Sequence, residues 1–288
     1  MNQGSADVLS TINTIPPFPT VALKAIQALR GPDSSAGDVV EIIQYDPGIT
    51  ANILRTVNSA YYSLPQKISS LKQAVAYLGA DKLINLLMLS GAISYLRGKD
   101  AQYPLESEDL LTHSVTTALL AEALGRKIDI ADPALIYTAG LLHDIGKIVL
   151  STYVRDRYHE IDTLIAQKGY SFLQAEEEIL GITHAQVGEA LARHWQFPET
   201  IIRPIAHHHA PRLPMADKQA ETATGVVYLA NQGSVFLRGR KSSDHWSFSE
   251  FENARKMVGI SMEDLDACLA QTRTQVPQAL LVIQSGQE

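Results

Sequence analysis

Cysteine is almost absent from this sequence, aromatic residues are few, and no block of positive charge occurs. The single cysteine, Cys268, excludes an internal disulfide framework and any site built from several thiolates, which is typical of a reducing compartment. Aromatic residues make up 7% of the chain, and the net charge is −7. Stacking on bases and binding to a phosphate backbone need the opposite composition, so we expect no direct contact with nucleic acid.

Long apolar runs are missing as well. The longest, at residues 83–95, contains Asn85, Ser90 and Gly91, and none reaches the roughly 20 residues that span a membrane. The opening MNQGSADVLSTINTIPPFP has neither the basic start nor the apolar core of a signal peptide. A chain of 288 residues, 45% of them hydrophobic, can still bury a large core. We therefore predict a soluble, cytoplasmic protein that makes no membrane contact.

Apolar residues recur at helical spacing along most of the sequence, whereas no stretch alternates between apolar and polar residues as a strand does. The pattern predicts an all-α fold. Residues 98–106 contain glycine, proline and charged residues and are the best candidate for a linker. We expect a boundary near residue 103, with one helical unit at 1–103 and a second at 104–288. We also expect Pro277 to interrupt the last helix.

The segment TAGLLHDIGKIVL, residues 138–150, places His143, Asp144 and Lys147 among apolar and small residues. A buried carboxylate without a partner costs several kcal/mol, so Asp144 requires either a cationic side chain or a metal ion. On a helix, His143 shares a face with small residues, Gly146 among them, that let other helices approach closely. We expect a pocket assembled from several helices.

Four further histidines could converge on this pocket, namely His113, His184, His208 and His209. Imidazole and carboxylate donors without thiolate suit a six-coordinate Fe, Mn or Mg site, or a zinc site with nitrogen and oxygen ligands. Such a divalent metal would lower the pKa of a bound water and polarise a phosphoryl oxygen. Lys147, one turn from the His-Asp pair, could then bind phosphate.

Each of these residues also has a plainer interpretation. A histidine on a helix is usually exposed or satisfied within the core, and His184 lies where it could help to cap a helix. The run 207–209 could be the solvated end of a loop. Asp144 could form a purely structural ion pair with Lys147 or with Arg126.

The ordered set of a histidine, a His-Asp pair, a further histidine and a His-His pair resembles the HD superfamily of metal-dependent phosphohydrolases. The first hundred residues narrow the resemblance to the HDOD branch, through Asp46-Pro47 and the run NSAYY at residues 58–62. The stretch WQFPETIIRPIAHHHAP, residues 195–211, fits the same branch. The resemblance covers roughly residues 14–235.

The HDOD resemblance implies a multi-helical HD-type core with an N-terminal helical subdomain packed against it. It also implies a role in bacterial signal transduction, often as the output domain of a response regulator, with a signalling protein as partner. No receiver domain is recognisable in this sequence, so we expect an isolated output domain or a stand-alone protein. The metal ligands under this resemblance are His113, His143, Asp144, His184, His208 and His209.

Two departures from the superfamily pattern bear on activity. Where the hydrolases usually have an Asp ligand on a later helix, this chain has Asn231, a neutral amide that removes one negative charge and weakens cation binding. The GYP segment of the cyclic-dinucleotide phosphodiesterases is missing, and Ala-Pro-Arg-Leu-Pro follows His209 instead. Hydrolysis of cyclic di-GMP is therefore disfavoured.

Our leading hypothesis is a regulatory interaction module with a degenerate or weakly metallated HD pocket, which acts through a protein partner or a sensed ligand. The rival hypothesis is an active metal-dependent phosphohydrolase on a nucleotide or another phosphoester, in which Asp144 bridges two ions. A third hypothesis is an interaction protein whose pocket binds nothing.

Overall fold

Helices are the only regular elements in the described part of the computed structural model, which confirms the predicted all-α fold. The described residues are 3–28, 35–59, 64, 66–96, 107–130, 132–211, 217–239 and 247–285. The boundary predicted near residue 103 lies outside them, so the division into two units stays a prediction.

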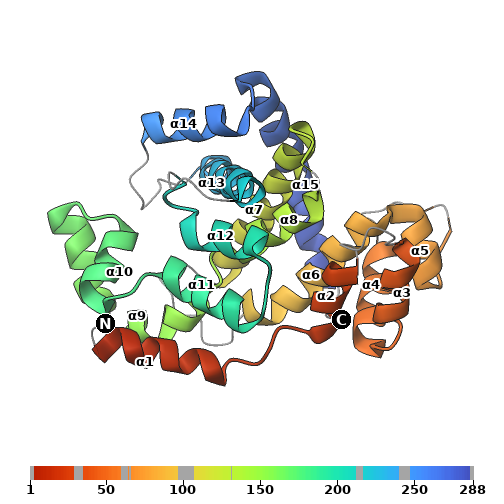
Figure 1. Cartoon of the computed structure of the whole chain (residues 1–288), viewed down its shortest axis with the longest axis horizontal. Helices are drawn as coiled ribbons and strands as arrows, with labels where there is room; N and C mark the ends of the chain where they lie inside the picture. The colour runs from red at the N-terminus through yellow and green to blue at the C-terminus, as the bar shows by residue number, and fades with distance from the viewer. Residues whose placement is uncertain are drawn as a thin grey trace.

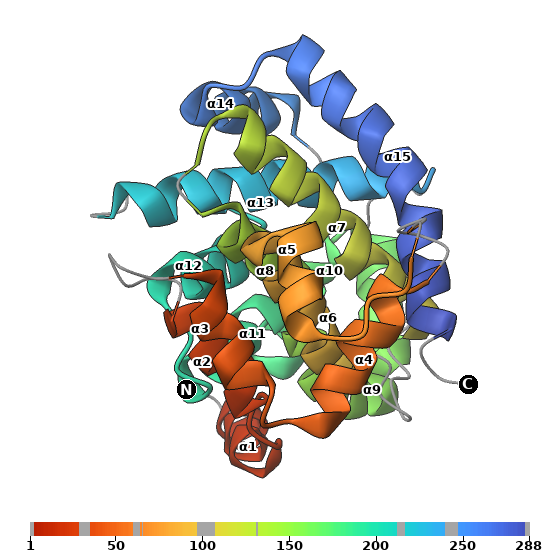
Figure 2. The same ribbon diagram turned by 90° about the vertical axis from the view of Figure 1, so that its right-hand side faces the viewer.

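In the described part of the chain, six α-helices and one short 3₁₀ helix precede the candidate ligands. They are α1 (Gln3–Thr11), the 3₁₀ helix η1 (Ile12–Thr14), α2 (Thr20–Ala28), α3 (Ala36–Ile43), α4 (Pro47–Val57), α5 (Leu71–Leu78) and α6 (Ala80–Leu96). Figure 1 shows α2 to α5 gathered at one side of the molecule, and Figure 2 shows the same group from the front. Helix α6 contacts α2, α4 and α5 as well as α7 and α8, so it joins this group to the rest of the fold.

The remaining helices build the core that holds the candidate ligands. They are α7 (Ser107–Lys127), α8 (Pro133–Leu142), α9 (Gly146–Lys168), α10 (Phe172–Leu180), α11 (His184–His194), α12 (Glu199–His207), α13 (Lys218–Leu237), α14 (Phe248–Val258) and α15 (Met262–Ser285). Helix α8 contacts α6, α7, α12 and α13 and lies at the centre of this core.

Local sequence explains several helix ends. The Asp46 carboxylate accepts a hydrogen bond of 3.0 Å from the backbone N–H of Ile49, and Pro47 occupies the first turn of α4, where its missing N–H costs nothing. The Ser70 side chain caps α5 by accepting a hydrogen bond from the backbone N–H of Gln73, and Gly79 ends that helix with a φ of 80°, a conformation that glycine adopts without strain.

The interruption predicted at Pro277 is wrong, because α15 continues through this residue to Ser285. A proline within a helix leaves the carbonyl four residues earlier without its backbone donor. Here that carbonyl belongs to Arg273, and both residues are exposed on the surface of α15. Water can therefore take the place of the missing donor, and the helix persists.

One stretch of the described chain, Pro133–Ser151, is long and apolar enough by length and composition to cross a membrane. It consists of α8 and the start of α9, and 89% of its most apolar window is buried inside the protein. A segment that is already covered by neighbouring helices has no apolar surface to offer to lipid. Its hydrophobicity is that of a central core helix.

Residues 138–150 form the end of one helix, a turn and the start of the next. Helix α8 ends at Leu142, the turn at 143–145 carries the His-Asp pair, and α9 begins at Gly146. A Cβ atom on Gly146 would lie 2.0 Å from the backbone oxygen of His184, so the start of α9 approaches the backbone of α11 directly. The close approach that small residues predict is present, and it brings His184 next to the turn.

The C-terminal end of α11 packs on the N-terminal part of the chain through aromatic rings. The indole N–H of Trp195 donates a hydrogen bond of 3.2 Å to the backbone oxygen of Pro16. Ring centroids lie 5.3 Å apart between Phe18 and Trp195, and 5.1 Å apart between Tyr95 and Trp195. Helix α1 also contacts α9 and α11. Residues 3–20 and α6 are thereby held against the helix that begins at His184.

The contact between α9 and α11 predicts a severe effect of Gly146→Ala. The new methyl group would meet backbone atoms that cannot move away, and we expect a loss of about 3 kcal/mol or more in the free energy of unfolding. Thermal unfolding followed by circular dichroism measures this loss. Gly48→Ala is the matched control, since its Cβ would meet Asp46 at an ordinary distance of 3.4 Å. Equal melting temperatures of the two variants would contradict the contact.

Candidate metal centre

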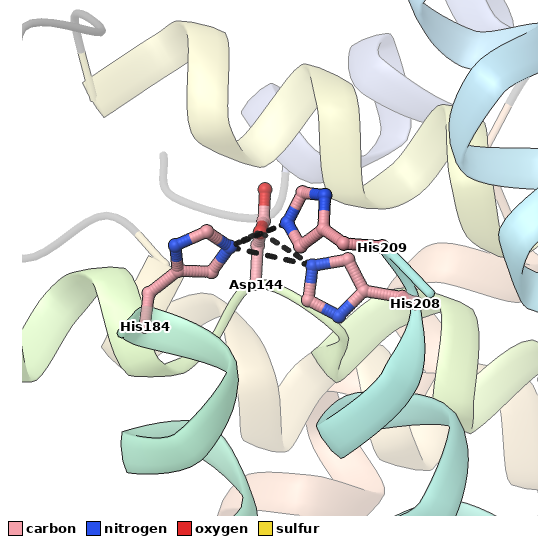
Figure 3. Close-up of side chains that lie close together, drawn as sticks. All are labelled: Asp144, His184, His208 and His209. Carbon is pink, nitrogen blue, oxygen red and sulfur yellow. Dashed lines mark hydrogen bonds and ion pairs between the residues drawn. The ribbon is translucent and has the colours of Figure 1, made fainter. Parts of the chain in front are cut away.

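The six predicted ligands come together from four parts of the chain. His113 belongs to α7, His143 and Asp144 to the turn before α9, and His184 to the first turn of α11, while His208 and His209 directly follow α12. Figure 3 shows the side chains of Asp144, His184, His208 and His209 pointing toward one another. All six are buried except His209, which is half-buried. Their donor atoms form two groups within 4.8 Å, and Asp144 belongs to both.

The two carboxylate oxygens of Asp144 face different histidines. Oδ1 lies 3.3 Å from Nε2 of His184 and 3.5 Å from Nε2 of His208. Oδ2 lies 3.4 Å from Nε2 of His143 and 3.5 Å from Nε2 of His113. The carboxylate thus stands between two sets of imidazole rings.

Lys147 partly compensates the charge of this buried carboxylate. Its ammonium group lies 2.6 Å from Oδ2 of Asp144, one turn further along the chain. Burial alone would raise the pKa of Asp144, but the ammonium of Lys147 and the neighbouring His143 outweigh this effect and hold that pKa well below its usual value. Asp144 is therefore ionised at neutral pH.

Outer hydrogen bonds fix the orientation of three imidazole rings. Nδ1 of His143 lies 2.8 Å from the carbonyl oxygen of Gly140, and Nδ1 of His208 lies 2.8 Å from that of Ile205. Nδ1 of His184 lies 2.6 Å from the carboxylate of Glu176. Carbonyl and carboxylate oxygens only accept hydrogen bonds, so in each of these rings Nδ1 carries the hydrogen.

A divalent metal fits this arrangement of donors. A neutral imidazole with its hydrogen on Nδ1 has a lone pair on Nε2, and the Nε2 atoms of His184 and His208 face an ionised carboxylate. Lone pairs and a negative charge repel one another unless a cation lies between them. Oδ1 of Asp144 also has no hydrogen-bond partner although it is buried. Asp144, His184, His208 and His209 would hold the ion, and their role as ligands stays a prediction.

Most of the interpretations that need no metal site do not agree with the positions of these residues. Arg126 pairs with Glu122 at 2.9 Å and not with Asp144. The N-cap of α11 is Thr183, so His184 is not the capping residue. His208 is fully buried and is no solvated loop end. The ion pair between Asp144 and Lys147 is present, but it meets only one of the two carboxylate oxygens.

Helix α13 borders the pocket on the side of His113. The hydroxyl oxygen of Ser234 lies 2.9 Å from Nδ1 of His113. Asn231 is buried one turn earlier on the same face of α13, and Arg238 follows one turn later at the end of this helix. The position at which an Asp ligand was expected therefore carries an amide on the helix that contacts His113.

Sequence reasoning missed two residues that orient the ligands, Glu176 and Ser234. Glu176 is fully buried and accepts hydrogen bonds from Nδ1 and from the backbone N–H of His184, at 2.6 and 3.0 Å. It opens a run of three glutamates that resembles a solvated surface. Its spacing from Phe172 and Leu180 would have placed it on the apolar face of α10, and this was the available signal.

The helical fold and the buried cluster together define the class to which this protein belongs. It is an all-helical protein built around a buried centre of histidine and aspartate side chains. A profile of the HDOD domain family matches residues 15–211, and the chain belongs to this family. The resemblance seen in the sequence is confirmed.

Two relatives of known sequence match part of the chain. A protein of Treponema pallidum named only as uncharacterized is 29% identical over 239 residues, which are 82% of this chain and 45% of that protein. Ribonuclease Y of Thermus thermophilus is 33% identical over 164 residues, 57% of this chain and 23% of that enzyme. This chain therefore spans less than half the length of either relative.

Two solved structures share the fold over nearly the whole chain. An HDOD domain protein of unknown function from Geobacter sulfurreducens has a TM-score of 0.73 and 26% identity, and covers 94% of this chain and 98% of its own. A protein from Marinobacter aquaeolei that is provisionally assigned to signal transduction has a TM-score of 0.74 and 20% identity, with 99% of this chain and 61% of its own covered. The second similarity shows the fold alone.

The buried histidines predict that the metal-free protein loses stability in mild acid. Burial, with neighbouring histidines, holds the pKa of His113 and of His208 well below the ordinary value of 6.5. The unfolded chain binds protons at these two positions near pH 6.5, whereas the folded chain does not. Stability is therefore full above pH 6.5 and falls below it, by up to about 1.4 kcal/mol per pH unit for each histidine.

Thermal unfolding of chelator-treated protein between pH 8 and pH 5.5 measures this loss. Replacement of the exposed His194 by Asn should leave the slope unchanged. A melting temperature that stays constant down to pH 5.5 would show that the two histidines are not held neutral.

Proposed function

We propose that this HDOD chain is a cytoplasmic regulatory output domain of bacterial signal transduction. It acts through a signalling protein partner or a sensed ligand, without direct contact to nucleic acid or membrane. Its His/Asp pocket holds a divalent metal, Fe, Mn, Mg or Zn, as part of a sensing core and not as a complete hydrolase centre. The signal-transduction role provisionally assigned to the Marinobacter protein of the same fold supports this proposal.

One observation carries the proposal, the small negative charge of the donor set. Among the six predicted ligands only Asp144 is a carboxylate, and the ammonium of Lys147 already lies 2.6 Å from one of its oxygens. The further carboxylate expected on a later helix is replaced by the amide of Asn231. Two divalent cations would bring four positive charges to a donor set whose one carboxylate is already paired with Lys147. This favours a weakly metallated regulatory pocket.

The link between the pocket and the N-terminal helices supports a role in signalling. Helix α11 begins with His184 in the pocket and ends against Phe18 and Tyr95 through Trp195. We propose that a change at the ligand end of this helix alters the packing at its other end. Regulation needs such a connection between a site and a surface that a partner can contact.

A bound metal would supply Lewis acidity and a bound water of lowered pKa. The protein's own groups would hold it through the Nε2 atoms and Oδ1 of Asp144, and the rings are held in place by their outer hydrogen bonds. Lys147 lies beside Asp144 with 12% of its side chain exposed. We propose that it binds the phosphate of a ligand that enters there.

The second candidate function is an active metal-dependent phosphohydrolase. The two overlapping donor groups that share Asp144 favour it, because two ions bridged by one carboxylate can act together on a phosphoester. The missing carboxylate at Asn231 counts against it. Metal-dependent turnover of a phosphoester would distinguish the phosphohydrolase from the regulatory domain.

We expect metal in protein purified without a histidine tag, but no metal-dependent turnover of nucleotides, phosphoesters or cyclic di-GMP. Elemental analysis and product detection measure the two quantities. Asp144→Asn should remove the metal, because it removes the only carboxylate of the donor set. Asp156→Asn, at a position exposed on α9, should leave the metal content unchanged. Metal-dependent turnover that disappears in a folded Asp144→Asn variant would establish the phosphohydrolase and overturn the regulatory proposal.

Trp195 provides a second test, because it reports on the far end of α11. The chain has two tryptophans, so Trp246→Phe leaves Trp195 as the only indole. We expect its fluorescence emission to change when Mn²⁺ or Zn²⁺ is added to metal-free protein, and this response to vanish in a His184→Asn variant. Emission that is the same with and without bound metal would contradict the connection through α11.

A further inference from the structure

The carboxylate of Asp144 divides the pocket into two halves with different surroundings. The His184 half consists of Asp144, His184, His208 and His209. The His113 half consists of His113, His143 and Asp144. Oδ1 of Asp144 faces the first half and Oδ2 faces the second.

The His184 half contains a buried polar atom without a hydrogen-bond partner, Oδ1 of Asp144. The Nδ1 atoms of His184 and His208 both donate to oxygens outside the donor group, so the Nε2 atoms are the ones that face Asp144. They lie 3.3 and 3.5 Å from Oδ1. A hydrogen on Nε2 of His209 could reach Nε2 of His184 at 2.8 Å, but Oδ1 would still face the lone pair of His208. A cation among these atoms removes the repulsion.

The polar atoms of the His113 half can find hydrogen-bond partners without a metal ion. The hydroxyl of Ser234 rotates freely and can donate to Nδ1 of His113 at 2.9 Å, a shorter contact than the 3.4 Å to the backbone oxygen of the same residue. His113 then carries its hydrogen on Nε2 and donates it to Nε2 of His143 at 3.1 Å. Oδ2 of Asp144 accepts a hydrogen bond from Lys147 at 2.6 Å. Each of these atoms has a hydrogen-bond partner, and although Nε2 of His143 also lies 3.4 Å from Oδ2, that oxygen is paired with Lys147 whereas Oδ1 has no partner.

Fixed charges reinforce this difference. The ammonium of Lys147 would repel a metal ion bound at Oδ2. Arg238 lies close enough to His113 to contribute to the lowering of its pKa. The side chain of Asn231, on the same face of α13, adds no negative charge. The His113 half is thus bordered by two cations and an amide.

Glu176 adds negative charge next to the His184 half, whereas the His113 half is bordered by positive charge. It is fully buried, lies 2.6 Å from Nδ1 of His184, and also accepts the backbone N–H of that residue at 3.0 Å. A carboxylate behind an imidazole fixes its tautomer and makes it a stronger electron donor to a metal. Asp144 and Glu176 together place two carboxylates around His184.

We infer that the pocket is asymmetric: one divalent metal binds in the His184 half with Glu176 positioning His184, and the His113 half accepts no second ion. This inference rests on the metal-binding role proposed above and specifies where the ion binds and how many bind. It places the metal on the side of the pocket away from His143, which is itself part of the His-Asp pair.

Titration of the chelator-treated chain with Co²⁺ tests the inference. Calorimetry gives the number of sites and the Kd, and the visible absorption of Co²⁺ reports coordination by the protein. We expect one tight equivalent per chain. Glu176→Gln keeps the shape and the acceptor oxygen but removes the charge, and should weaken the Kd about 10- to 100-fold. Glu177→Gln is the matched control, because the neighbouring Glu177 is exposed on the same helix and should leave the Kd unchanged.

A second pair of variants locates the ion within the pocket. His184→Asn should weaken Co²⁺ binding more than Glu176→Gln does, and His113→Asn should leave the Kd close to that of the unaltered protein. Circular dichroism and thermal melting of the metal-free variants show that each is folded. If His184→Asn does not fold, Glu176→Gln and the number of sites decide the question.

Three results would overturn the inference. Two tight equivalents of Co²⁺ would show that both halves bind metal, and an unchanged Kd in Glu176→Gln would show that Glu176 does not position a ligand. A larger loss in His113→Asn than in His184→Asn would place the ion in the other half. Each of these leaves the metal-binding role intact, whereas the absence of any Co²⁺ binding would overturn both that role and the inference.

Discussion

An ionised carboxylate that water does not reach lies at the centre of this protein, and its charge sets the requirements for the surrounding structure. Asp144 has 1% of its surface exposed, and an uncompensated charge in that position costs several kcal/mol. The fold surrounds it with Lys147 and with imidazole rings from α7, α11 and the end of α12. These helices are far apart in the sequence, so the ring of donors around the carboxylate forms only when the whole helical core is assembled. The polar centre and the fold therefore depend on each other.

Close backbone contact makes this convergence possible. Gly146 lets the start of α9 touch the backbone of α11, and Gly140 brings α8 against the backbone of α7 near Thr117. A side chain at either position would separate two helices that carry ligands. The donor atoms need to approach within a few ångströms of one another, so even a small increase in the distance between these helices would disrupt the site. Glycine serves here to set the distance between functional groups, in addition to permitting dense packing.

The sequence predicts a large part of this site, because buried charge leaves a recognisable pattern. His143 and Asp144 stand out in an otherwise apolar segment, and the later histidines follow at spacings that point to a common pocket. Features that depend on tertiary contacts could not be predicted in this way. Glu176 is hidden in a run of glutamates, and only the packing of α10 against α9 decides which member of the run is buried. The effect of Pro277 likewise depends on whether solvent reaches the carbonyl that loses its donor, and the sequence does not report exposure.

The number of positive and negative charges in the pocket limits which functions the protein can perform. A centre that hydrolyses phosphoesters with two ions needs enough carboxylates to hold both through each turnover, whereas a sensing centre needs only an occupancy that changes with conditions. In the proposed arrangement, the neutral Asn231 and the ammonium of Lys147 would lower the affinity for a second cation, while Glu176 would strengthen a single position. A metal ion there would contact His184, which begins the helix that ends at the aromatic contacts of Trp195 with the N-terminal residues. The same features that would weaken a hydrolase would then suit a regulatory pocket.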